Sequence, residues 1–105
     1  MLLSGVYMET DKDIIKEDLM EKSNNILKKY NEPYIVDNIA IMNSRDNINF
    51  LGNLRVMVDD SVKSIKKDLE AAFREYDNVT IRERKVIPCC EPPYVHISFN
   101  IKINK

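Results

Sequence analysis

Hydrophobic and polar residues alternate along two stretches of the chain, as they do in strands with one buried face. In the first stretch the apolar positions of one parity are Ile48, Phe50, Leu54, Val56 and Val58. In the second, near the C-terminal end, they are Val95, Ile97, Phe99, Ile101 and Ile103. Two further strands are predicted, one over residues 34–42, which are rich in β-branched side chains, and a weaker one over residues 79–86.

Two other stretches carry apolar residues at spacings of three and four, the period of an amphipathic helix. The first helix is predicted from Thr10 or Asp11 to about Tyr30, with Ser23 as a weak point in its apolar stripe. It ends before Pro33, because the residue before a proline avoids helical geometry. The second helix follows three candidate N-caps at residues 59–61, and its stripe comprises Val62, Ile65, Leu69, Ala72, Phe73 and Tyr76. Both stripes should pack on one face of the sheet.

The connections between these elements predict the fold class. Residues 43–47 form a polar turn cluster, so the two flanking strands should make an antiparallel hairpin. Gly52 should mark a bulge or a close backbone approach. The order helix, hairpin, helix, strand over residues 11–86 predicts an α+β, ferredoxin-like α-β-β-α-β two-layer sandwich. A proline-rich loop and an additional C-terminal strand follow over residues 87–105, and residues 1–9 are an N-terminal stub or linker.

Composition limits the function classes. The chain has 105 residues, enough for one domain with a single core. Its 16 basic and 17 acidic residues give a net charge of −1, so nucleic acid or an anionic membrane could be bound only through a local patch. No apolar run approaches the ~18 residues of a membrane span, and the chain is expected to be soluble. Adjacent Cys89 and Cys90 cannot form an ordinary disulfide without strain, which favours a reducing compartment.

Few residues offer chemistry. His96 has no obvious serine or carboxylate partner in the sequence, and two glycines cannot build a phosphate-binding loop, so we expect no enzymatic activity. Cys89, Cys90 and His96, with Glu91 nearby, are the only cluster of borderline metal ligands and would suit zinc or another divalent cation. The simpler alternative is that the cysteines fill a loop and His96 is an exposed strand residue.

The sheet face away from the helices is the candidate interaction surface. Its apolar side chains favour a homodimer, with an interface formed by Leu51, Met57, Ala40 and Met42. Basic side chains could share this face and would suit RNA; they are Arg55, Arg82, Arg84 and Lys85. The strands lack a pair of aromatics placed to stack bases, however, so we do not expect nucleic acid as a partner.

Three stretches resemble the cytoplasmic C-terminal domain of the cation diffusion facilitator family of divalent metal transporters. Residues 32–41 resemble its proline-containing approach to the first strand, and residues 50–59 resemble its second strand, which ends in an acidic residue. Residues 61–76, followed by Asn78-Val79-Thr80-Ile81, resemble its amphipathic helix and closing strand. The resemblance covers roughly residues 11–86.

The resemblance implies a domain that follows the last membrane helix, dimerises and often binds divalent metal through His and Asp. Arg55 and Arg82 stand where the family often has histidines, and arginine cannot ligate a metal. Asp59 remains at the acidic position as a candidate ligand. We therefore predict a non-catalytic dimerisation and regulatory domain of a zinc-type efflux transporter, attached to its transmembrane portion on the cytoplasmic side of the cell membrane. The alternative is a stand-alone ferredoxin-like binding or regulatory module for a small ligand or RNA.

Overall fold

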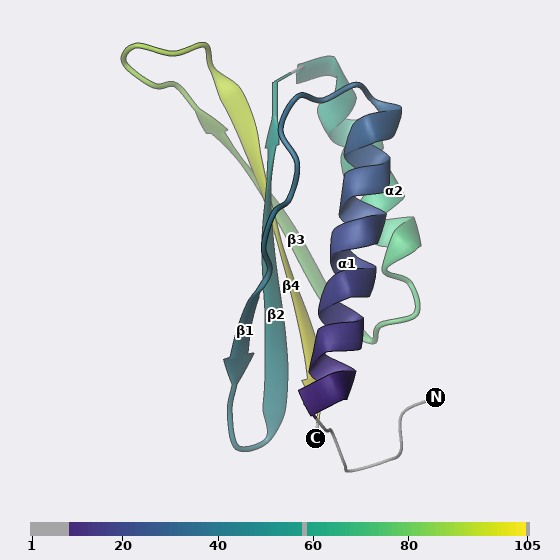
Figure 1. Ribbon diagram of the computed structural model, residues 1–105. Coiled ribbons are helices and arrows are strands. Elements are labelled where there is room, and N and C mark those ends of the chain that lie inside the picture. Colours follow the sequence, from purple (N-terminus) through teal and green to yellow (C-terminus); the bar gives the residue numbers. More distant parts are fainter. Residues whose placement is uncertain (1–8, 58, 105) are drawn as a thin grey trace.

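The computed structural model describes residues 9–57 and 59–104, with the backbone alone at residues 9–11 and 59. The predicted N-terminal stub at residues 1–8 lies outside this description. In chain order the elements are α1 (Glu9–Lys29), β1 (Ala40–Asn43), β2 (Asn47–Val56), the 3-10 turn η1 (Asp59–Ser61), α2 (Val62–Ala72), β3 (Asn78–Val86) and β4 (Tyr94–Asn104). Both helices lie on the same side of the sheet, so the fold is a two-layer sandwich (Figure 1).

The strands form one antiparallel sheet in the order β1-β2-β4-β3. This confirms the α+β class, and the order of elements is compatible with a ferredoxin-like sandwich. The last strand was expected as an addition to a sheet complete without it. Instead, β4 lies between β2 and β3 and pairs with both along their whole lengths. Its regular alternation is explained by this central position, since its helix-facing residues from Val95 to Ile101 are all buried.

The predicted first strand, residues 34–42, is mostly not a strand, because β1 begins only at Ala40. In the segment before β1, backbone groups are hydrogen-bonded to side chains and not to another strand. Asn24 of α1 donates from Nδ2 to the Val36 carbonyl oxygen (2.9 Å), and the Val36 N–H donates to Asn24 Oδ1 (2.7 Å). Buried Glu32 accepts the Met57 N–H at 2.7 Å. An extended segment is therefore held beside α1 without a neighbouring strand.

Helix α1 ends in a Schellman motif, which starts that segment. The Glu32 N–H donates to the Leu27 carbonyl oxygen (3.0 Å), and the Asn31 N–H donates to that of Lys28 (3.1 Å). Asn31 has a φ of 58°, the left-handed conformation that this motif requires. Helix α2 ends at Ala72, earlier than its apolar stripe predicted, and its N-cap residue Ser61 makes no side-chain capping bond.

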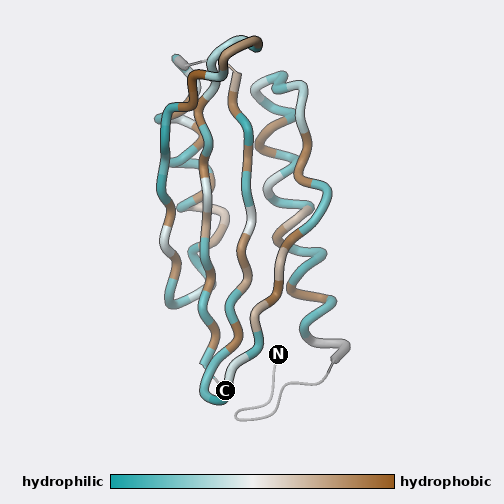
Figure 2. The backbone as a smooth tube through the Cα atoms, turned by 90° about the vertical axis from the view of Figure 1, so that its left-hand side faces the viewer, coloured by the Kyte–Doolittle hydropathy of each residue, from teal (hydrophilic) through white to brown (hydrophobic). Residues whose placement is uncertain are grey.

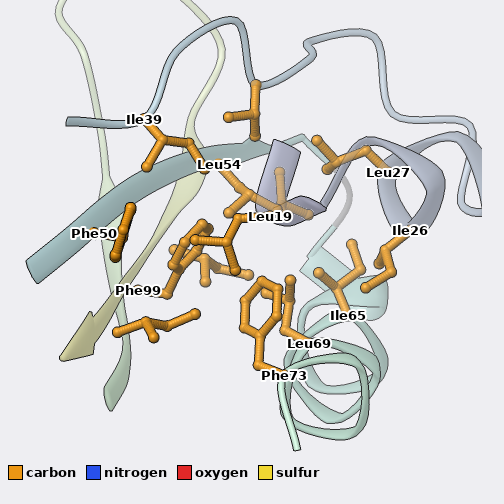
Figure 3. Close-up of a cluster of buried hydrophobic side chains, with 14 of the residues drawn as sticks. Leu19, Ile26, Leu27, Ile39, Phe50, Leu54, Ile65, Leu69, Phe73 and Phe99 are labelled. Carbon is orange, nitrogen blue, oxygen red and sulfur yellow. The ribbon is translucent and has the colours of Figure 1, made fainter. Parts of the chain in front are cut away.

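The core fills the space between the helices and the sheet (Figure 3). Its largest fully buried side chains include Phe50, Phe73 and Phe99. Gly52 is necessary here, because a Cβ atom at this position would lie 2.2 Å from Cζ of Phe99. The pairing of β2 with β4 is unbroken through Gly52, so this residue marks a close approach and not a bulge.

Two tyrosines at the edge of the core tie α1 to α2 and the turn that follows it. The Tyr76 hydroxyl donates to Asp18 Oδ2 (2.8 Å), and the Tyr30 hydroxyl donates to Asp68 Oδ2 (2.8 Å). Burial, with the carboxylate of Asp18, raises the pKa of Tyr76. The Tyr76 hydroxyl therefore stays protonated and donates its bond at neutral pH.

Candidate functional site

The candidate site is the sheet face that the helices leave uncovered, which we call the open face and which Figure 2 turns toward the viewer. Directly paired residues of neighbouring strands point to the same face, so the strand register defines its members. They are Ala40, Met42, Asn47, Asn49, Leu51, Asn53, Arg55, Asn78, Thr80, Arg82, Arg84, Val86, Tyr94, His96, Ser98, Asn100, Lys102 and Asn104. Most are polar, as expected of a sheet with one solvated side.

Charge on the open face has one sign. It carries Arg55, Arg82, Arg84 and Lys102, and none of its strand positions holds an Asp or Glu. None of these four forms a salt bridge with another described residue. The acidic residue of β3, Glu83, points to the helix side, where the Lys66 ammonium lies 3.0 Å from it. A chain with a net charge of −1 thus has a locally cationic sheet.

One row of this face places a histidine between two arginines. His96 of β4 is paired with Arg55 on β2 and with Arg84 on β3. Partial burial lowers the pKa of His96, and the positive charges of Arg84 and Arg55 lower it further. The imidazole is therefore neutral at pH 7, and it can donate or accept a hydrogen bond between two guanidinium groups.

Two tyrosines flank Arg55. Its guanidinium carbon lies 4.1 Å from the ring centroid of Tyr94 and 4.9 Å from that of Tyr34, within cation–π range of both. Tyr94 begins β4, whereas Tyr34 belongs to the extended segment that Asn24 and Glu32 hold in place. Tyr34 remains 47% exposed. This Tyr34–Arg55–Tyr94 stack therefore offers flat aromatic surface to solvent at one end of the open face.

A pocket lies on the open face beside the basic row. Its polar lining comes from three strands: Asn53, Ser98, Asn100, Thr80 and Arg82. The Oδ1 atom of Asn100 is buried and has no hydrogen-bond partner in the described part of the chain. Buried amide oxygens are normally paired, so this acceptor lacks a partner that such a group usually has.

The predicted metal ligands belong to different parts of the structure. Cys89 and Cys90 are free and exposed in the loop between β3 and β4, which projects away from the helices at the upper left of Figure 1. His96 lies within the sheet, and the side chain of Asp59 is outside the description. Among the residues described, no three or more His, Cys, Asp or Glu side chains gather where they could hold a metal ion. The zinc site stays a prediction.

The predicted surface residues are mostly where we expected them. Ala40, Met42 and Leu51 lie on the open face near β1, while Met57 follows the end of β2. Arg55, Arg82 and Arg84 do share this face. The expectation for Lys85 was wrong, because it pairs with buried Val95 and so points to the helix side.

The Tyr34–Arg55–Tyr94 stack and the unpaired acceptor of Asn100 were not predicted from the sequence. Tyr94 has the same parity as His96 and Lys102, a signal that places it on the open face. No comparable signal exists for Tyr34, since its approach to Arg55 depends on the path of a segment outside the strands.

Comparisons with known proteins identify no relative: no family model, curated protein or solved structure matches the chain. Within residues 9–57 and 59–104, neither helix has the length and apolar character that crossing a bilayer would require.

Proposed function

We propose that this domain is a non-catalytic binding module that holds an anionic partner on its open face. The observation that carries the proposal is the separation of charge: four cationic side chains share that face, without an acidic residue at any of its strand positions. Unpaired arginines on a surface bind phosphate and carboxylate groups through charge-assisted, often bidentate hydrogen bonds. A chain with a net charge of −1 has no overall attraction for anions, so binding would require a local cationic patch such as this face.

The chemistry of the face supports binding better than catalysis. General acid–base catalysis needs a group whose pKa lies near the working pH and a substrate position within its reach. Burial and the two flanking arginines lower the pKa of His96, the one histidine of the chain, and no strand residue of the face is a carboxylate that could orient it. A neutral imidazole between guanidiniums suits a hydrogen bond to a bound anion.

Retention on immobilised heparin, a sulfated polyanion, tests the proposal. The wild-type chain should be retained at low salt, and the double variant Arg82→Gln/Arg84→Gln should elute earlier. The matched control is Lys63→Gln/Lys67→Gln, which removes the same charge from exposed positions of α2 in the helix layer. Its elution should follow that of the wild type. Wild-type chain in the flow-through, or an equal loss in the control, would contradict the proposal.

A second candidate is the dimerising regulatory domain of a divalent-cation transporter. Its supporting observation is the apolar corner of the open face. There Ala40 is paired with Leu51, and Met42 is the next residue of β1 that points to the same face. A standard interface takes about 20–30 residues a side, so a dimer through this face would also bring the two sets of arginines together. Light scattering decides between the candidates: an anion-free dimer that Met42→Lys dissociates supports the transporter domain, and a monomer supports the binding module.

A further inference from the structure

We infer that the anionic partner is a single-stranded nucleic acid, which lies across the open face with a base on the Tyr34–Arg55–Tyr94 stack and phosphates on the arginines of β3. This inference rests on the proposed function and names its ligand class. The absence of an aromatic pair within the strands argued against nucleic acid. The stack changes that argument, because one of its two rings comes from the segment before β1.

The phosphate contacts follow from strand geometry. Arg82 and Arg84 are two residues apart on one strand, so their side chains leave the same face about 7 Å apart along β3. Two successive phosphates of an extended single strand can meet such a pair. Lys102, on the neighbouring strand, lies in the row that contains Asn78, at the other end of the face from the stack. The cations thus span the length of the sheet.

The stack favours nucleic acid over other polyanions. Bases stack on aromatic rings and on guanidinium planes, whereas a carboxylate or sulfate gains charge-assisted hydrogen bonds without a stacking contact. Tyr34 is 47% exposed although its ring lies against Arg55, so an aromatic surface is accessible directly beside the cations. A membrane surface would instead be met by a cluster of exposed apolar side chains flanked by lysines, and the rows that contain Arg82 and Arg84 carry neither.

The pocket between the stack and Lys102 supplies groups that read base edges. Asn53, Ser98 and Asn100 present amides and hydroxyls, which can donate and accept hydrogen bonds as bases require. Rotation of the Asn100 side chain would bring its Oδ1, which is buried and unpaired in the free domain, to an exocyclic amine or ring N–H of a base. A flat face with stacking, phosphate and edge contacts is typical of modules that bind single strands.

Fluorescence anisotropy with labelled oligomers tests the inference. The probes are an oligouridylate of about 12 nucleotides, an oligothymidylate of equal length, and an abasic strand that keeps the phosphates without bases. The wild type should bind both base-bearing strands more tightly than the abasic one. Tyr34→Ala should weaken binding of the base-bearing strands by roughly 5- to 150-fold and leave abasic binding unchanged. Tyr34→Phe, which keeps the ring, should bind as the wild type does.

The same titrations at several salt concentrations measure the phosphate contacts. Arg84→Gln should reduce the slope of log affinity against log salt by about 0.7, and Tyr34→Ala should leave the slope unchanged. Equal affinity for abasic and base-bearing strands would overturn the inference. So would equal competition by polyglutamate, or tighter binding to phosphatidylserine vesicles, although either result would leave an anion-binding face intact. Binding to none of these polyanions would overturn the proposed function as well.

Discussion

The contact between Asn24 and Val36 should be essential for stability, because it replaces a neighbouring strand for the segment that carries Tyr34. Asn24→Ala removes both hydrogen bonds and leaves the N–H and the carbonyl of Val36, a residue only 3% exposed, without these partners. An unsatisfied buried polar group costs about 1–3 kcal/mol. Two such groups, less about 0.5 kcal/mol gained because alanine is the better helix former, give an expected loss of about 1.5–5.5 kcal/mol.

Urea unfolding followed by circular dichroism measures this loss. For a domain whose total stability is about 5–15 kcal/mol, the change is large, and at an m value near 2 kcal/mol/M it moves the midpoint by about 1–3 M. The control is Asn25→Ala, one position along α1, where the side chain is exposed and the gain in helix propensity is the same. If the two variants unfold within about 0.5 kcal/mol of each other, the pairing with Val36 does not hold the segment and the reasoning is refuted.

Three further predictions concern the core and the open face. Gly52→Ala should destabilise the fold by about 1–3 kcal/mol, because its Cβ would overlap the ring of Phe99, and Phe99→Leu in the same chain should restore part of the loss in thermal unfolding. Ser23→Ala should raise stability by about 1 kcal/mol in urea, since the Ser23 hydroxyl is buried without a hydrogen-bond partner among the described residues; a lower midpoint would refute this. His96 has a folded pKa below its ordinary value, so the unfolded chain binds more protons and stability should fall as pH drops from about 6.5 toward the folded pKa. His96→Gln should remove that part of the slope, and an NMR titration of this single histidine should show the lowered pKa, which bound polyanion should raise.

The fold was largely predictable, because its signals are local. Alternation along β2 and β4 and the stripe of α2 are set by the burial of one face, and each appears directly in the sequence. The position of β4 is not a local property. An apolar alternating strand suits the centre of a sheet or its edge, and only long-range pairing with β2 and β3 decides between them.

Residues 34–39 show a conflict between propensity and context. Their β-branched side chains favour a strand, yet the backbone of Val36 pairs with the side chain of Asn24. The candidate site shows the same limit. Parity alone placed three arginines on one face, whereas the contact of Tyr34 with Arg55 joins residues 21 positions apart through a path that no periodicity encodes.

Backbone chemical-shift mapping by NMR tests the central claim most directly. Unlabelled oligouridylate of about 12 nucleotides is added to the isotopically labelled chain, and each amide is followed. The account predicts that amides of β3, β4 and β2 around Arg84, His96 and Arg55 shift together with that of Tyr34, while those of the outer face of α2 around Lys63 and Lys67 stay in place. Shifts centred on α2, or no shifts at all, would contradict a binding site on the open face.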